Sequence, residues 1–151
     1  MKTTLAVLVA AAAVALAGCG ANDHSTADPL HAAAPATLWD RYGDQLRPLN
    51  QDTCPALSLT DRCRKNTLPR AGVAAEVAAA ERNEPLTTNI ENLLAVEVMI
   101  KKSADTFKGE FCDTIGSTLD CGPEAHEIND LYQAFVKGVL EISGQPTTSV
   151  P

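Results

Sequence analysis

Four cysteines in two evenly spaced pairs are the residues of this chain that are best suited to chemistry. One pair is Cys54 and Cys63, the other is Cys112 and Cys121, and both have the spacing Cys-x8-Cys. Thiols can bind zinc, but structural zinc ligands usually come in closer pairs such as Cys-x2-Cys. Thioredoxin-like redox chemistry uses Cys-x-x-Cys, which this sequence lacks. We therefore predict two disulfides, provided that the chain leaves the reducing cytosol.

Four cysteines allow three connectivities, and the sequence favours the local one. Short loops close at the lowest entropic cost, which predicts the disulfides Cys54–Cys63 and Cys112–Cys121. Each of these pairs also brackets an expected bend between two helices. The crossed alternative, which joins Cys54 to Cys112 and Cys63 to Cys121, would tie one bend to the other and remains open at this point.

One histidine and a run of acidic residues are the other candidates for a site. His126 and Asp130 are four residues apart, a helical spacing that can hold a metal or orient an imidazole. His126 is off the apolar stripe of its segment, so we expect it at the surface. The stretch 109–130 has six acidic residues and no lysine or arginine, but it lacks the regular spacing of a calcium loop. We predict no catalytic residue, no metal site and no cofactor.

The first eighteen residues have the character of a secretory signal peptide. Lys2 supplies a positive charge, and an unbroken apolar run follows from Leu5 to Ala17. A charged start before about 7–15 apolar residues is the usual signal-peptide pattern. The run is shorter than the roughly 20 residues that a membrane-spanning helix needs. We therefore predict that residues 1–18 are a signal peptide and that the chain is exported.

A four-residue motif, Leu16-Ala17-Gly18-Cys19, ends the apolar run. It resembles the lipobox of bacterial lipoproteins, and this resemblance covers residues 1–19. It implies that the Cys19 thiol takes a diacylglyceryl group and that signal peptidase cuts just before this residue. It also implies a location at the cell membrane, where lipid would hold the domain on the extracytoplasmic face. Gly20 stands where some lipoproteins have the aspartate that retains them at an inner membrane, and the choice between inner and outer membrane stays open.

The chain after residue 18 has the length and charge of one acidic domain. It contains 133 residues, a common size for a single domain. Without Lys2, 11 of the 12 basic residues remain against 19 acidic ones, which gives a formal net charge of −8. Such a charge argues against nucleic acid as a partner and against a polybasic membrane patch. The expected contact with the membrane is therefore the lipid on Cys19.

The spacing of apolar residues predicts an all-α fold, a small disulfide-stapled bundle of about four helices in two hairpins. Residues 19–35 lack this periodicity, so the lipidated cysteine is expected to begin a flexible tether. Residues 36–144 are expected to form the helical domain, and residues 145–151 a disordered tail.

Local signals predict where the first two helices begin. Thr37 is a suitable N-cap for the first helix. We expect the second to open at Leu68-Pro69, because proline suits a first turn, and the segment 54–70 to be a loop or a short helical turn. The predicted core stripes of these two helices are Leu38, Tyr42, Leu46 and Leu49, then Val73, Val77 and Ala80.

Similar signals bound the other two helices. Thr88 and Glu91 have the spacing of a capping box for the third helix. Gly109 marks an end for it, and the apolar spacing of Phe107, Phe111 and Ile115 leaves a longer helix open. The fourth starts near Pro123 and has Gly144 as its C-cap. The predicted core stripes are Ile90, Leu93, Leu94, Val96, Ile100, Ala104 and Phe107, then Ile128, Leu131, Phe135, Val139 and Ile142.

The two bends are expected to meet at one end of the bundle. The first carries Arg62, Arg64, Lys65 and Arg70, whereas the second is acidic, and opposite charges would attract across the contact. Both cysteine pairs and several apolar positions recur at an offset of 58 residues. This offset suggests an internal duplication, although any two amphipathic helices can be aligned in this way.

These features favour a binding role over catalysis. We expect a lipid-anchored extracytoplasmic domain that acts without catalysis, as a binding module for an envelope protein or small ligand or as part of an envelope assembly. The alternative is a small cell-envelope hydrolase that uses carboxylates. A deep pocket with two carboxylates of shifted pKa would favour the enzyme, and an exposed apolar groove or patch would favour the binder.

Overall fold

A computed structural model describes residues 35–114 and 120–147 of the chain. In these residues the fold is all-α, a disulfide-stapled bundle of four helices with no strand. None of the helices in these two ranges is long and apolar enough to cross a membrane. The predicted signal peptide, Cys19 and the tether up to residue 34 lie outside the described residues, and the tail is described only to Thr147. The helices are α1 (Leu38–Asn50), α2 (Asp61–Glu81), α3 (Thr88–Gly109) and α4 (Gly122–Ile142).

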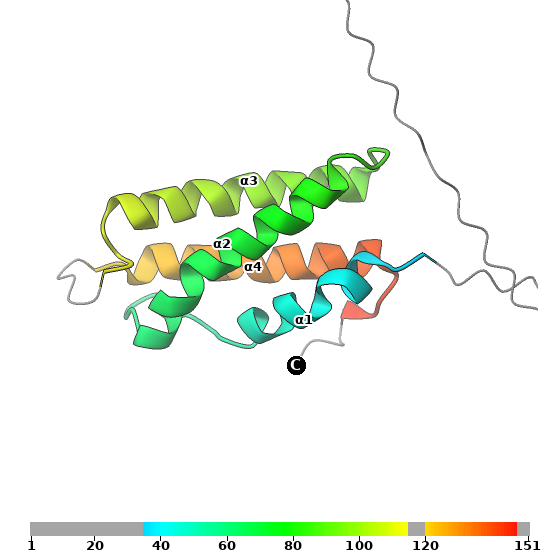
Figure 1. Cartoon of the computed structure of the whole chain (residues 1–151). Coiled ribbons are helices and arrows are strands. Elements are labelled where there is room, and N and C mark those ends of the chain that lie inside the picture. The colour runs from blue at the N-terminus through cyan, green and yellow to red at the C-terminus, as the bar shows by residue number, and fades with distance from the viewer. Residues whose placement is uncertain (1–34, 115–119, 148–151) are drawn as a thin grey trace, which may run out of the picture. The chain divides into compact units, whose positions relative to one another are not determined.

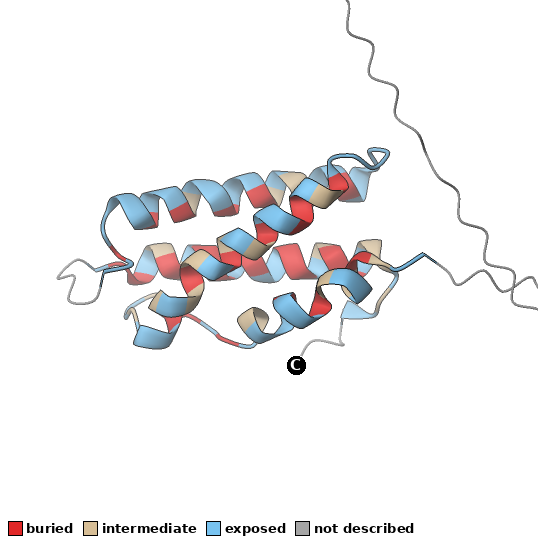
Figure 2. Ribbon diagram, in the orientation of Figure 1, coloured by how far each residue is buried: buried red, intermediate tan, exposed pale blue. Residues whose placement is uncertain are grey.

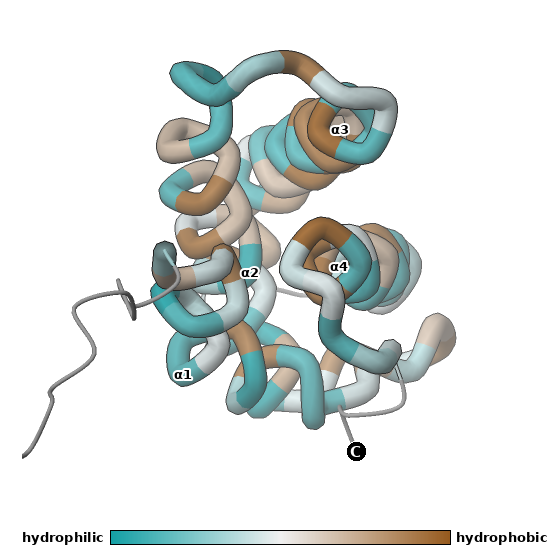
Figure 3. The backbone as a smooth tube through the Cα atoms, turned by 90° about the vertical axis from the view of Figure 1, so that its right-hand side faces the viewer, coloured by the Kyte–Doolittle hydropathy of each residue, from teal (hydrophilic) through white to brown (hydrophobic). Residues whose placement is uncertain are grey.

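The helices form two hairpins, α1 with α2 and α3 with α4, as the sequence predicts (Figure 1). Both bends lie at the same end of the bundle, and the turn between α2 and α3 lies at the other. α4 packs against all three other helices, whereas α3 contacts only α2 and α4. The view along the bundle shows α3 and α4 side by side (Figure 3). α3 is therefore an outer helix with much of its surface open.

The beginning of α1 is confirmed. The Thr37 hydroxyl accepts a hydrogen bond from the Asp40 backbone N–H at 3.2 Å, and the Asp40 carboxylate accepts one from the Thr37 N–H at 2.9 Å. This reciprocal capping box satisfies two helix-end donors, and it lowers the pKa of Asp40. The Trp39 backbone N–H donates to Ser143 Oγ at 2.9 Å, so the start of α1 is held against the end of α4.

The predicted start of the second helix is wrong. α2 begins at Asp61, and Pro69 lies inside it. Thr60 is the N-cap, because its hydroxyl accepts a hydrogen bond from the Cys63 N–H at 3.2 Å. Pro69 has no backbone N–H, so it cannot donate the helical hydrogen bond to the carbonyl of Lys65, four residues earlier. Lys65 is exposed, so water can bond to that carbonyl instead. The residues at 61–68 therefore extend the helix instead of forming a loop.

The structure corrects the predicted N-cap of α3 and confirms where the helix ends. Thr87 is the N-cap instead of Thr88, since its hydroxyl accepts from the Ile90 N–H at 3.3 Å. The helix ends at Gly109 as expected, but the left-handed residue that closes it is Phe111, with φ of 59°. The Cys112 N–H donates to the Phe107 carbonyl at 3.1 Å, which completes a C-terminal cap of the kind that glycine usually provides.

The predicted bounds of α4 agree with the structure. The helix starts at Gly122 with Pro123 in its first turn and ends at Ile142. Gly144 has a φ of 65°, and the Gln145 N–H donates to the Leu140 carbonyl at 2.9 Å. This is a Schellman cap, in which glycine adopts the left-handed conformation at little cost.

The core is a band of buried side chains along the inner faces of the helices (Figure 2). Most predicted stripe residues of α3 and α4 belong to it, but the α2 face is centred on Ala74, Val77 and Ala78 instead of Val73, Val77 and Ala80. Glu81 and Glu97 are also buried, and they pair with half-exposed arginines: Arg41–Glu81 at 3.1 Å and Arg82–Glu97 at 3.0 Å. The largest fully buried side chains are Arg70, Tyr132, Phe107, Phe135, Leu46 and Leu93.

The two bends meet, as predicted, but opposite charges do not make the contact. Arg64 Nη1 donates to the Thr114 carbonyl of the second bend. A Cβ atom at Gly122 would lie 2.8 Å from the Ala56 carbonyl oxygen, so only glycine permits this approach. Arg62 pairs with Asp52 of its own hairpin at 2.6 Å, and no ion pair joins the bends among the described residues. The contact therefore combines an arginine side chain bonded to a backbone carbonyl with the close approach of two backbone segments.

Candidate functional site

The four paired cysteines form the two disulfides predicted from the sequence. Cys54 joins Cys63 with a Cα–Cα distance of 5.5 Å, and Cys112 joins Cys121 with 5.7 Å. Each bridge closes one bend, and all four residues are buried. Burial shields the sulfur atoms from thiols in solution, so these bridges have the character of structural staples.

A buried arginine that the sequence analysis missed holds the first disulfide in place. The Arg70 side chain is fully buried; its Nε donates to the Leu49 carbonyl at 3.1 Å and its Nη2 to the Asp52 carbonyl at 2.6 Å. Its Nη1 lies 3.1 Å from Cys54 Sγ. Burial lowers the pKa of this guanidinium, and the Asp52 carboxylate opposes that effect. Because arginine stays charged in proteins, Arg70 fixes the chain between α1 and the disulfide as a buried cation.

Tyr132 of α4 completes this buried polar cluster. Its hydroxyl donates to the Leu46 carbonyl at 3.3 Å, and the Arg70 guanidinium carbon lies 6.0 Å from the centre of its ring. Burial raises the pKa of the Tyr132 phenol well above its ordinary value, so the phenol stays neutral at physiological pH. The cluster links α1, α2 and α4. We assign it a structural role, because its polar groups bond to other buried groups of the protein.

His126 is half-buried instead of lying fully at the surface as expected. Its Nδ1 donates to the Cys54 carbonyl at 2.7 Å, which ties α4 to the first bend. Its Nε2 lies 3.4 Å from Asp130 Oδ2. Both ring nitrogens therefore face protein groups, and this residue positions the bend.

The acidic stretch 109–130 does not gather into a metal centre in its described part. No three histidine, cysteine or carboxylate side chains come together in ranges 35–114 and 120–147. Glu124, Glu127 and Asp130 lie at steps of three in the first half of α4.

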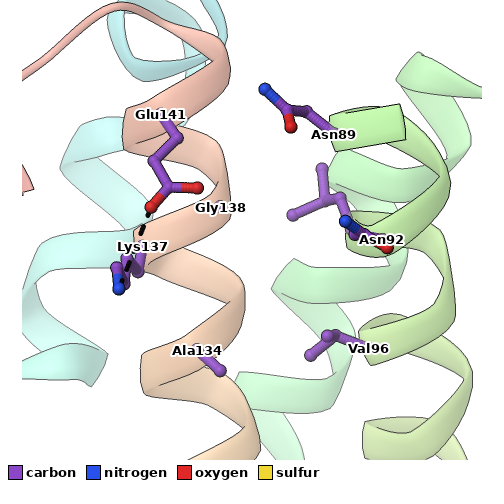
Figure 4. Close-up of a pocket in the computed structure, with 8 residues that line it drawn as sticks. Asn89, Asn92, Val96, Ala134, Lys137, Gly138 and Glu141 are labelled. Carbon is purple, nitrogen blue, oxygen red and sulfur yellow. Dashed lines mark ion pairs between the residues drawn. The ribbon is translucent and has the colours of Figure 1, made fainter. Parts of the chain in front are cut away.

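A first hollow lies between the start of α3 and the end of α4 (Figure 4). It has a volume of about 180 Å³. Leu93 and Val96 give it an apolar floor, and Ala134 and Gly138 give it a low wall. A Cβ atom at Gly138 would lie 3.1 Å from Leu93 Cδ1, so the glycine lets the two helices approach closely. Asn89, Asn92, Lys137 and Glu141 form the rim, where Lys137 pairs with Glu141 at 3.9 Å.

A second hollow, of about 330 Å³, lies further along the same two helices. Met99, Ser103 and Thr106 line it from α3, together with Lys102. Glu124 and Glu127 line it from α4. Glu124 Oε2 is buried and has no hydrogen-bond partner among the described residues. A buried carboxylate oxygen without a donor is unfavourable, so this atom is ready to accept a hydrogen bond from a ligand.

The two hollows lie on one face, as the residue spacing shows. On α3 the lining residues recur at steps of three and four: Asn89, Asn92, Val96, Met99, Ser103 and Thr106. On α4 they do the same: Glu124, Glu127, Ala134, Gly138 and Glu141, with Leu131 at the position between the hollows. These steps mark one side of a helix, so we treat the hollows as one shallow channel, the α3–α4 groove.

An exposed apolar side chain lines the α3–α4 groove: Met99 is 47% exposed. The groove is open to solvent, and Glu124 and Glu127 line its second hollow from the same helix.

The comparisons with known proteins return no match. No family model, no curated protein and no solved structure is similar to this chain.

Proposed function

We propose that this protein is a lipid-anchored, extracytoplasmic binding module that holds an envelope partner without catalysing a reaction. The observation that carries the binding role is the α3–α4 groove, with its apolar floor and the exposed Met99 in its lining. Concave sites with an apolar lining and a few polar groups are typical of binding sites. The two disulfides support the location, because such bridges persist in oxidising compartments. The lipobox-like motif at Cys19 supports the anchor.

Lipid attachment is tested at Cys19. Wild-type protein in cells fed a clickable fatty-acid analogue is expected to take up the label and to fractionate with membranes. Cys19→Ser is expected to lose the label, because no thiol remains for the diacylglyceryl group. Cys54→Ala combined with Cys63→Ala serves as the control and should keep the label, since these two residues form a disulfide in the folded domain. A wild-type protein without label would rule out the anchor.

The binding role is tested by photocrosslinking in living cells. A benzophenone amino acid at Met99 of the full chain is expected to yield a discrete adduct after irradiation, because a partner in the groove would lie within reach. The matched position is Ala75, which is equally exposed on α2 and should yield none. Adducts of equal strength at both positions, or none at either, would contradict a binding role for the groove.

A further inference from the structure

The shape of the α3–α4 groove fits an α-helix. Its lining residues recur every three and four positions on both walls, which is the spacing at which one helix packs against another. Ala134, a small exposed residue of the first hollow, permits close approach of a backbone. The lining residues of α4 run from Glu124 to Glu141, so the groove offers a length of about 25 Å, or roughly 17 residues of a docked helix.

The charges of the groove select the chemistry of that helix. Lys137 and Glu141 neutralise each other at 3.9 Å. At the other end, Glu124 and Glu127 have no ion-pair partner in the described residues and outnumber the single Lys102. Glu124 Oε2 also lacks any hydrogen-bond donor there. A lysine or arginine from a partner would supply the missing donor and the missing charge.

We propose that the α3–α4 groove binds an amphipathic helix of a partner protein, with apolar residues at steps of three and four and basic residues flanking them. The apolar residues would cover Val96 and Met99, and one basic side chain would reach Glu124. This inference rests on the proposed binding function and names the class of partner. It goes beyond that function because it requires both a helical shape and a positive charge.

The test measures binding of two synthetic peptides to the full chain in a zwitterionic detergent, by fluorescence anisotropy. Both peptides are helical, about 20 residues long, and carry leucine at steps of three and four. One has lysine at its polar positions and the other has glutamate. We expect the lysine peptide to bind about tenfold more tightly than the glutamate peptide, because charge complementarity at a groove edge selects its partner.

Variants with matched controls decide whether the groove is the binding site. Ala134→Trp fills the groove from an exposed position and should abolish binding, whereas Ala75→Trp on α2 should leave it unchanged. Glu124→Gln combined with Glu127→Lys should remove the preference for lysine, whereas Glu76→Lys should keep it. Circular dichroism confirms that each variant is folded.

Two results would overturn the proposal. One is equal binding of both peptides to the wild type, and the other is binding that Ala134→Trp leaves intact. A crosslink at Met99 together with equal peptide binding would reject the basic helix and retain the binding function. Loss of both the crosslink and peptide binding would reject the function itself.

Discussion

Replacing Arg70 by methionine is expected to destabilise the domain by about 3–5 kcal/mol, the range for removal of one partner from a buried charged cluster. The change keeps most of the volume of the side chain and removes its donors. The Leu49 and Asp52 carbonyls would lose their hydrogen bonds, and each unsatisfied buried group costs about 1–3 kcal/mol. Urea denaturation followed by circular dichroism measures the difference in the free energy of unfolding.

Arg62→Met is the matched control for this experiment. Arg62 also contacts Asp52, at 2.6 Å, but its side chain is 77% exposed. Exposed ion pairs contribute about 0–1 kcal/mol, so this variant should stay within that range. Equal losses in the two variants would show that charge near Asp52, instead of the buried hydrogen bonds, determines the stability of this cluster.

Removal of both disulfides is expected to have the largest effect on stability. In the chain-entropy model, a bridge that closes a loop of about ten residues contributes roughly 2.5–3 kcal/mol. Loss of both would remove about 5–6 kcal/mol, comparable to the whole stability of many domains. Cys→Ala pairs are the suitable variants, because all four sulfurs are buried and a serine hydroxyl would need a partner there.

The two single-bridge variants and a mapping experiment complete this test. Cys54→Ala with Cys63→Ala, and Cys112→Ala with Cys121→Ala, should each cost about half of the total in a urea titration. Digestion of the oxidised wild type without reductant, followed by mass spectrometry, should recover only the local pairs. A peptide that joins Cys54 to Cys112 or Cys121 would contradict the connectivity.

The sequence alone determined the fold class and the disulfide pairing of this protein. Apolar residues at steps of three and four predict helices whatever the tertiary structure, because the backbone alone sets the period of the α-helix. Thr37, Pro123 and Gly144 marked helix ends correctly, since caps depend on local hydrogen bonds. The local pairing followed from loop entropy, which depends only on separation along the chain.

Local signals failed where packing outweighed them. Pro69 suggested the start of a helix, but the Thr60 cap and the disulfide at Cys63 hold the preceding turns of α2 together. Charge suggested that Arg70 lies in solvent, because arginine is seldom buried without partners. Its partners are backbone carbonyls of the segment 49–52. Every residue has a backbone carbonyl, so the sequence does not indicate which of them bind an arginine.

Only the tertiary structure decided the candidate site. The lining residues of the α3–α4 groove lie one position before the core stripes of their helices, as Val96 does beside Glu97 and Ala134 beside Phe135. Taken singly, most of them are ordinary surface residues, and the sequence placed Leu93 and Val96 in the predicted core instead of a site. They form a channel because α3 and α4 pack side by side and α1 does not cover α3. Which helices become neighbours depends on the packing of the whole bundle, and no single helix encodes it.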